Sequence, residues 1–391
     1  MSDYQLLSNI VGYVDAMAAK EVLAENGTDF TEKKGAVRRV IHALHPKRLT
    51  LRVVGIKRET STTVTIRLQS EDGQNLPPFQ AGQYINLFVD IDGVKTARPY
   101  AIASSSAHRQ YYEVTVKKSE GGYVSHYLVD QLQLGQVISS SGPVGDFHHN
   151  PLFHGEDLVF LAGGSGSVPA RSMMLNILDR GLPYRFHLIY SNSYEHDVIY
   201  AEELEAIVSR SEQLRLTSMI TRPSEGYEGL TGRLTAERLT ELLGSDRSVL
   251  ASKMYYLCGP TPFNDSCAAL LTKLGVPSRR IRIEANGAPK NPNTQQGWPE
   301  GVALEDEVTV TVKGRGSFIS TVGEPLLNAL ERNGYGVENA CRSGEYSLCR
   351  VKLVSGRVYN PQEAHLRKSD RDFGWIYSCV AFPLEDIEVE I

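Results

Sequence analysis

The sequence predicts a multidomain chain in which a small antiparallel β-barrel precedes a doubly wound parallel α/β domain and a C-terminal β-rich domain. Two changes of pattern support this order. From about Leu49 apolar residues alternate with a period of two, and from Leu158 short apolar strands instead alternate with helical segments. A length of 391 residues is enough for several such domains.

The composition is that of an ordinary globular protein with a sizeable core. Hydrophobic residues make up 41% of the chain and charged residues 22%. The net charge of −5 and the pI near 6.1 give no general attraction to nucleic acid or to anionic membranes. There is no apolar run long enough to span a membrane and no signal-peptide pattern, so a cytoplasmic location is expected.

Residues 1–47 predict a helical N-terminal extension. Apolar residues recur at helical spacing from Leu6 to Leu23, and Arg38–His45 suggests a second short helix. Two roles are open for such a segment. Its apolar face either packs on its own chain or docks a partner.

Residues 48–150 predict the antiparallel barrel. Several short alternating segments, separated by turns such as Ser70–Pro78, are typical of a small barrel. The expected strands are Leu51–Gly55, Thr63–Leu68, Tyr84–Val89 and Tyr112–Lys117.

Two stretches of the barrel have the chemistry to bind a flat aromatic group with a phosphorylated tail. In the first, Tyr100 can stack on a ring, and Arg98 can bind phosphate through its planar guanidinium. The second opens a predicted helix, whose free N–H groups suit a pyrophosphate. The expected contacts are Arg98, Pro99, Tyr100, Ala101, Gly121, Gly122, Val124 and Ser125.

Residues 151–288 predict a parallel sheet covered on both faces, because strand, turn and helix alternate. The strand Val159–Ala162 runs directly into Gly163, Gly164, Ser165 and Gly166, which let the backbone approach a phosphate closely. A ligand is expected here, at the carboxyl ends of the strands. The other expected elements are strands Tyr184–Tyr190, Leu214–Ile220 and Met254–Cys258, and helices Ala170–Leu178, Glu202–Ser209 and Thr235–Leu243 and one after Asn264.

Residues 289–303 predict a linker rich in Pro, Asn and Gly, and residues 304–391 predict a last domain. An odd total of five cysteines argues against a disulfide framework. Three of them, Cys341, Cys349 and Cys379, lie in this domain and favour a metal site over apolar packing. A zinc site would need a fourth ligand, and His365 is the nearest histidine in sequence.

These motifs, in this order, resemble the ferredoxin–NADP reductase superfamily, and the domain order resembles its phthalate dioxygenase reductase and phenylacetyl-CoA epoxidase reductase group. The resemblance does not reach residues 1–47. It implies a flavin-binding barrel, an NAD-binding domain and a plant-type ferredoxin-like domain of the β-grasp fold. It further implies an NADH-dependent flavin oxidoreductase that passes electrons through flavin, and through a [2Fe-2S] centre if one is loaded, to a metalloenzyme such as an oxygenase.

The resemblance also assigns residues of the reaction site. Cys258-Gly259-Pro260 resembles a motif whose cysteine lies beside the hydride-donating carbon of nicotinamide, although an inert buried cysteine is the alternative. Glu284 corresponds to an acidic residue near the flavin edge, so Cys258, Tyr100 and Glu284 are the implied catalytic residues. Ser191–Asp197 lacks Arg and Lys, which favours NADH, with Ser191 and Asp197 expected on the adenosine side.

The chain departs from the family pattern at two positions. At the first, Ala101 stands where Ser or Thr is common. FAD is the expected flavin, and FMN is the alternative. The ferredoxin loop has Cys-x4-Cys-x2-Cys and a distant fourth cysteine. Here Cys341, Cys349 and Cys379 are the expected metal ligands, and Tyr346 replaces the second cysteine.

This replacement leaves three functional possibilities. The cluster is held with an unusual ligand, supplied by Tyr346, Ser347 or water, or the chain is an NADH:flavin diaphorase with a cluster-free, structural ferredoxin domain. A non-catalytic subunit is the third possibility.

Overall fold

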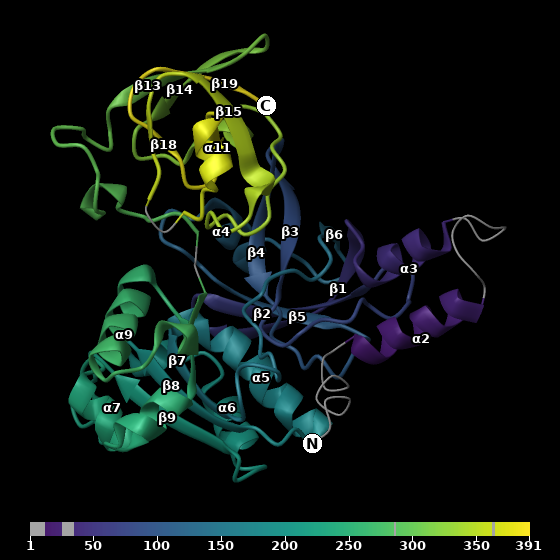
Figure 1. The fold of residues 1–391 in the computed structure, drawn as a ribbon, viewed down its shortest axis with the longest axis vertical. Coiled ribbons are helices and arrows are strands. Elements are labelled where there is room, and N and C mark those ends of the chain that lie inside the picture. Colours follow the sequence, from purple (N-terminus) through teal and green to yellow (C-terminus); the bar gives the residue numbers. More distant parts are fainter. Residues whose placement is uncertain (1–11, 26–34, 285–286, 362–363) are drawn as a thin grey trace. The chain divides into compact units, whose positions relative to one another are not determined.

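The computed structural model describes residues 12–25, 35–284, 287–361 and 364–391 (Figure 1). The chain forms two compact units, one made of residues 1–87 and 100–284 and the other of residues 88–99 and 285–391. No helix among the described residues is long and apolar enough to span a bilayer.

An antiparallel sheet confirms the barrel expected from the sequence. Its six strands lie in the order β4-β3-β6-β1-β2-β5. Leu51 and Val53 of β1 are buried, while Arg52 between them is exposed, because successive side chains of a strand point to opposite faces. The strands are β1 Leu49–Thr60, β2 Thr63–Ser70, β3 Tyr84–Ile91, β4 Val94–Ala101, β5 Tyr112–Lys117 and β6 Val137–Ser140.

Two of these strands, β4 and β6, were not predicted. β4 contains Lys95, Arg98 and Pro99, and β6 is only four residues long. Neither has the apolar alternation that marks a strand. Each forms because a neighbouring strand pairs with it, as β6 does with the first residues of β1.

Two helices precede the barrel, α2 Tyr13–Glu25 and α3 Ala36–Leu44. α2 buries none of its residues, and Asp15 pairs with Arg109 of the barrel at 3.3 Å. Leu6, where the expected helical pattern begins, lies outside the described residues. Docking of a partner by this segment therefore stays a prediction.

The second part of this unit is a parallel sheet with the strand order β10-β9-β8-β7-β11-β12. Figure 1 shows α5 and α6 on one side of it and α7 and α9 on the other. Phe160 and Ala162 of β7 pack with the residues of α5, whereas Val159 and Leu161 pack with those of α7 and α9. The doubly wound fold is confirmed. The strands are β7 Asp157–Gly163, β8 Arg185–Asn192, β9 Leu214–Ile220, β10 Leu230–Thr231, β11 Met254–Cys258 and β12 Ile281–Glu284, and the helices are α5 Ser167–Arg180, α6 Ala201–Val208, α7 Ala236–Leu243, α8 Arg247–Ser252 and α9 Thr261–Lys273.

The C-terminal unit contains a mixed sheet in the order β14-β13-β19-β15-β17. The parallel pair β13 and β19 lies inside the sheet, and Leu326 and Leu330 of α10 pack on the same core as Val310 and Val389. This is the expected β-grasp fold. The elements are β13 Glu307–Val312, β14 Gly316–Thr321, α10 Leu326–Arg332, β15 Arg350–Ser355, β16 Val358–Tyr359, α11 Lys368–Asp372, β17 Trp375–Tyr377, β18 Phe382–Pro383 and β19 Ile387–Glu390.

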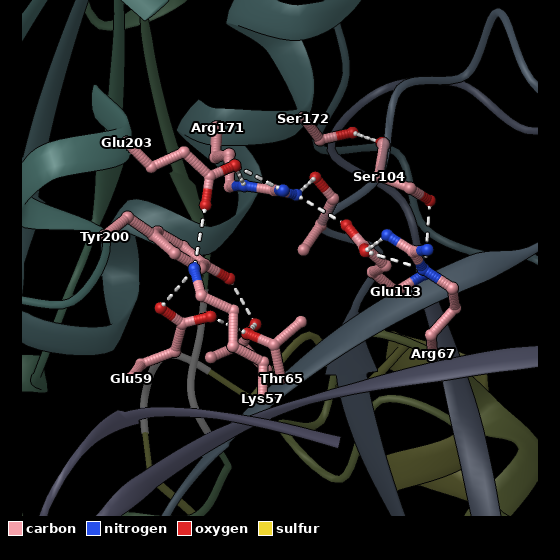
Figure 2. A network of polar contacts seen from close by, with 12 residues as sticks. Lys57, Glu59, Thr65, Arg67, Ser104, Glu113, Arg171, Ser172, Tyr200 and Glu203 are labelled. Carbon is pink, nitrogen blue, oxygen red and sulfur yellow. Dashed lines mark hydrogen bonds and ion pairs between the residues drawn. The ribbon is translucent and has the colours of Figure 1, made fainter. Parts of the chain in front are cut away.

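A buried arginine joins the barrel to the parallel sheet (Figure 2). Arg171, on α5, donates to the carbonyl of Ala103 at 2.7 Å and to Oε2 of Glu113 on β5 at 3.0 Å. Its Nε donates to Glu203 at the start of α6 at 2.7 Å. Burial acts to lower the pKa of Arg171, but Tyr200, Glu203 and Glu113 together raise it above the ordinary value, so the cation is retained.

Further hydrogen bonds and ion pairs near Arg171 join the barrel to the parallel-sheet domain. Ser172 donates to the carbonyl of Ser104 at 2.7 Å. Glu113 also accepts from Arg67 of β2 at 2.7 Å, so its charge is balanced from both sides. Lys57 of β1 lies 3.3 Å from Glu203. The barrel and the start of α5 are therefore fixed to each other by ionic and hydrogen bonds between the two parts of one unit.

Replacing Arg171 by Met should destabilise this unit strongly. It leaves Glu203 and Glu113 without their buried cation, a loss on the order of 3–5 kcal/mol. Arg67→Met is the matched control, because that side chain is 49% exposed and its pair is worth about 1 kcal/mol or less. Thermal and urea unfolding of both variants would measure the difference. Equal losses would contradict a special role for Arg171.

Candidate functional site

The glycine-rich loop lies at the carboxyl end of β7. Gly164–Gly166 form a single 3-10 turn, η1, and Ser167 then begins α5. A Cβ on Gly166 would lie 1.7 Å from the carbonyl oxygen of Cys258, so no other residue fits. The loop therefore packs directly on Cys258-Gly259-Pro260, and the structure brings these two predicted motifs together. The N–H of Ser167 donates to the carbonyls of Gly164 and Ser165, and Pro169 has no N–H, so a phosphate at the first turn of α5 stays a prediction.

Cys258 and Glu284 are also brought together. They are register partners at the carboxyl ends of β11 and β12, and Cys258 pairs with Ala162 on its other side. Burial, and then the charge of Glu284, raise the pKa of the Cys258 thiol far above its usual value. The thiol is therefore neutral at physiological pH. It can pack against a ring, but it is no thiolate nucleophile.

Sequence reasoning missed Asn264, near the start of α9. Its Nδ2 donates to the carbonyl of Glu284 at 3.1 Å, while its buried Oδ1 has no hydrogen-bond partner among the described residues. An unsatisfied buried acceptor beside Glu284 and the Cys-Gly-Pro turn suits a carboxamide donor such as that of nicotinamide. No sequence motif marks it, because its role depends on the pairing of β11 with β12.

The expected adenosine side contains cations that the local sequence lacks. Ser191 lies at the end of β8 as the register partner of Gly163. Asp197 lies 4.0 Å from Lys117. Arg222, which follows β9, donates to the hydroxyl of Tyr194 at 3.2 Å. Lys117 belongs to β5 of the barrel and Arg222 follows β9, so a search confined to Ser191–Asp197 could not find them.

The predicted flavin-binding residues of β4 form a half-buried row. Arg98, Pro99, Tyr100 and Ala101 are all partly exposed, and Arg98 and Tyr100 share one face of the strand. Nη1 of Arg98 donates to the Thr96 hydroxyl at 2.6 Å and to the carbonyl of Ala97 at 2.8 Å. A half-buried aromatic ring next to a guanidinium fits a flavin and its phosphate, and these individual roles stay proposals.

The second flavin stretch begins α4, Tyr123–Asp130. Gly121 has a φ of 65°, and a Cβ on Gly122 would lie 2.5 Å from Oγ of Ser125. Ser125 accepts from the backbone N–H of Ser119 at 3.1 Å, and Val124 is buried. Both glycines are therefore required by the tight entry into the helix, and an anion at its first turn stays a prediction.

The three cysteines of the C-terminal unit converge. Cys341, Cys349 and Cys379 are buried, and the sulfurs of Cys349 and Cys379 are 3.1 Å apart. A hydrogen bond from Cys379 lowers the pKa of Cys341 to about 5. Among the described residues no group of three or more His, Cys, Asp or Glu side chains could hold a metal ion. Binding of a [2Fe-2S] centre by these three thiols therefore stays a prediction, and a centre with four protein ligands would need one further donor.

A buried ion pair connects the cysteine loop to the residues around Arg98. Arg342, next to Cys341, donates to both carboxylate oxygens of Glu331 at 2.8 and 2.9 Å and to the carbonyl of Ala97 at 3.0 Å. Glu331 also accepts from Thr96 at 2.8 Å and lies 3.6 Å from Arg98. All these residues belong to one unit. The pairing of Arg342 with Glu331 was not predicted, because it depends on how the loop packs on α10.

Comparison with known proteins identifies the domains of the chain. Three family models match the chain: an oxidoreductase FAD-binding domain over residues 50–149, an oxidoreductase NAD-binding domain over 160–269 and a 2Fe-2S iron-sulfur cluster binding domain over 310–384. The glycine betaine monooxygenase reductase subunit of Pseudomonas aeruginosa is 30% identical over 325 residues, covering 80% of this chain and 87% of that protein.

Two further proteins match the chain over most of their length. One component of the 1,2-phenylacetyl-CoA epoxidase of Escherichia coli is 27% identical, covering 87% of this chain and 97% of that protein. The structure of phthalate dioxygenase reductase matches with a TM-score of 0.65 at 20% identity, covering 88% of this chain and 98% of that one, which shows a shared fold. The chain therefore belongs to the ferredoxin–NADP reductase superfamily, as an NAD(P)H-dependent flavin oxidoreductase with a C-terminal plant-type ferredoxin domain.

Proposed function

We propose that this chain is the reductase component of an oxygenase system, in which it takes electrons from NADH and delivers them to a partner metalloenzyme. The observation that carries the proposal is the pairing of β11 with β7 and β12. Cys258 lies between Ala162, which leads into the glycine loop, and Glu284, and this arrangement supports a nicotinamide site at the loop that would bind the dinucleotide phosphates. Relatives named as reductase components of monooxygenases support the acceptor class. A cytoplasmic location is part of the same proposal.

The residues of the chain act by binding and orientation. When bound, FAD accepts two electrons from NADH as a hydride and releases them singly, which is what a one-electron acceptor requires. The first turn of α5 holds the pyrophosphate, and Asn264 orients the carboxamide of the nicotinamide. The neutral Cys258 thiol packs against that ring, and Tyr100 and Arg98 hold the flavin. Arg171 lies on α5 and bonds Ala103 and Glu113 of the barrel. These bonds also set the position of the glycine loop, at which α5 begins.

A second candidate is favoured by one specific observation, Tyr346 at the second cysteine position. It is the NADH:flavin diaphorase with a cluster-free ferredoxin domain. Both functions predict that NADH bleaches the flavin and supports reduction of ferricyanide. Only the reductase predicts reduction of cytochrome c that is lost when residues 304–391 are removed. The test compares both acceptors with the full chain and the truncated chain, and flavin content is measured as the folding control.

Replacing Cys258 by Ala should slow reduction of the flavin by NADH, because the nicotinamide loses its packing surface. The expected loss is about tenfold, corresponding to about 1.4 kcal/mol. Because the raised pKa keeps the thiol protonated, the wild-type rate should show no inflection from Cys258 between about pH 6 and 9. Stopped-flow absorbance gives both results. Cys267→Ala, a buried cysteine on α9, is the control, and an equal effect there would contradict the assignment.

Replacing Glu331 by Gln should destabilise the C-terminal unit by roughly 3 kcal/mol or more, since Arg342 would be left buried without its counterion. Transfer to cytochrome c should slow, because the cysteine loop and the strand that carries Arg98 lose their common anchor. Reduction of the flavin by NADH, the step before transfer to cytochrome c, is measured in the same assay. Glu338→Gln, an exposed acid of the same segment, should change neither stability nor rate. A Glu331→Gln variant that is as stable as Glu338→Gln, and transfers electrons to cytochrome c as fast, would refute the anchoring role of the Arg342–Glu331 pair.

A further inference from the structure

The segment that leaves the barrel, residues 146–154, is bonded to β11. Tyr256 of β11 is fully buried, and its hydroxyl oxygen lies 2.8 Å from Nδ1 of His154 and 3.2 Å from Nδ1 of His149. The Tyr256 ring also packs edge-on against Phe147 of the same segment. One tyrosine of β11 therefore contacts this segment through both its ring and its hydroxyl.

The hydrogen bonds of this cluster fix the positions of its protons. The backbone N–H of Asn150 donates to Nδ1 of His154 at 3.0 Å, so that nitrogen is unprotonated and the Tyr256 hydroxyl donates to it as well. The hydroxyl oxygen then accepts from Nδ1 of His149. Both imidazoles are therefore neutral, and burial lowers the pKa of His154 to about 4 and that of His149 to about 3.

The second nitrogen of His149 shows what this imidazole contributes. Nε2 is buried and has no hydrogen-bond partner among the described residues. An unsatisfied buried acceptor costs on the order of 1–3 kcal/mol, and an apolar ring in the same space would avoid that cost. The bond from Nδ1 to Tyr256 is therefore what a histidine adds at this position.

The other end of the segment is fixed to the barrel. Backbone hydrogen bonds pair Val144 with Tyr84 at the start of β3, and Nε2 of Gln83 donates to the carbonyl of Gly145 at 2.9 Å. The carbonyl of Gln83 in turn accepts from the N–H of Ile102, the residue after β4, at 2.9 Å. Hydrogen bonds and a short stretch of chain therefore connect the end of β4 to β11.

The same segment is bonded to β12. Arg282, the register partner of Tyr256, donates to the carbonyl of Asp146 at 2.6 Å. Two residues further along these strands lie Cys258 and Glu284, which are register partners as well. Residues two apart share one face of a strand. The segment is thus held to both strands one step before the two residues assigned to the nicotinamide site.

We propose that the Tyr256 hydroxyl is a positioning group for hydride transfer. Through His149 and His154 it ties the Cys258 end of β11 to a segment anchored beside the end of β4, and so sets the distance between nicotinamide and flavin. The proposal rests on the proposed function, in which the nicotinamide binds beside Cys258. Reaction rates are sensitive to such a distance, since a displacement of about 1 Å can cost about 100-fold.

The test uses the full chain reconstituted with FAD and compares Tyr256→Phe, which keeps the ring and removes the hydroxyl, with Tyr255→Phe. Tyr255 is a matched control on β11, because it is also fully buried, packs on the opposite face of the sheet and donates one hydrogen bond, to the carbonyl of Leu250 at 3.0 Å. Stopped-flow absorbance at increasing NADH gives the limiting rate of flavin reduction and the dissociation constant of NADH. In Tyr256→Phe the limiting rate should fall about tenfold, while the dissociation constant changes by less than about twofold. Tyr255→Phe should change neither.

The pH dependence of the limiting rate separates positioning from a general loss of structure. Tyr256→Phe removes a donor to Nδ1 of His154, so the pKa of His154 should rise from about 4 toward its usual value. A protonated His154 no longer accepts from the N–H of Asn150, so the rate should fall at a higher pH than in the wild type. Tyr255→Phe should keep the wild-type profile. Both variants retain the other titratable and charged groups around the two histidines, which are Asp146, His148, Tyr184, Arg280 and Arg282.

A Tyr256→Phe variant with the limiting rate and the pH profile of Tyr255→Phe would overturn the proposal. So would an unchanged limiting rate with weaker binding of NADH, which would place the hydroxyl in binding instead. His149→Phe keeps a ring against Tyr184 and removes the Nδ1 donor, so it should also lower the limiting rate. A wild-type rate in that variant would likewise contradict the proposal, which keeps the test decisive if Tyr256→Phe does not fold.

The wild type distinguishes this proposal from the function on which it rests. A flavin that NADH does not bleach in the wild type would refute the proposed function itself. A flavin that is bleached in the wild type, and equally fast in Tyr256→Phe, would refute only the role of Tyr256.

Discussion

Arg171 is a cation buried between two carboxylates, Glu113 of the barrel and Glu203 of the nucleotide domain. The helix that carries it begins at the glycine loop, and its neighbour Ser172 bonds the carbonyl of Ser104, just beyond β4. One helix therefore fixes the glycine loop relative to the barrel. Hydride transfer depends on that geometry, since small displacements between donor and acceptor reduce the rate steeply.

The C-terminal unit also contains a buried arginine that is paired with a carboxylate. The buried pair of Arg342 and Glu331 joins the cysteine loop to the segment that carries Thr96 and Arg98. Such a pair contributes little net stability, because the desolvation of both charges offsets their attraction. The pair instead fixes the two segments relative to each other, since removal of either partner leaves the other charge buried and uncompensated. The glycine loop and the cysteine loop are thus each held in place by a buried arginine whose partners the sequence does not reveal.

The cysteine loop retains three of the four cysteines of the expected ligand pattern. All three are buried, and the sulfurs of Cys349 and Cys379 are 3.1 Å apart. Tyr346 stands at the expected second cysteine position, and its carbonyl lies 4.0 Å from the Cys349 sulfur. The substitution therefore removes one thiol while the other three cysteines of the pattern stay buried.

The sequence by itself determined the fold class, the cofactor-binding motifs and the shortage of one cysteine, because glycine turns, strand periodicity and ligand spacing are local features. It did not determine β4 and β6, whose pairing comes from neighbouring strands, or the roles of Asn264, Arg171, Arg222 and Glu331. Those residues act on partners that lie far away in the chain. The register of β7, β11 and β12 and the burial of charge are properties of tertiary packing, so only the structure decided them.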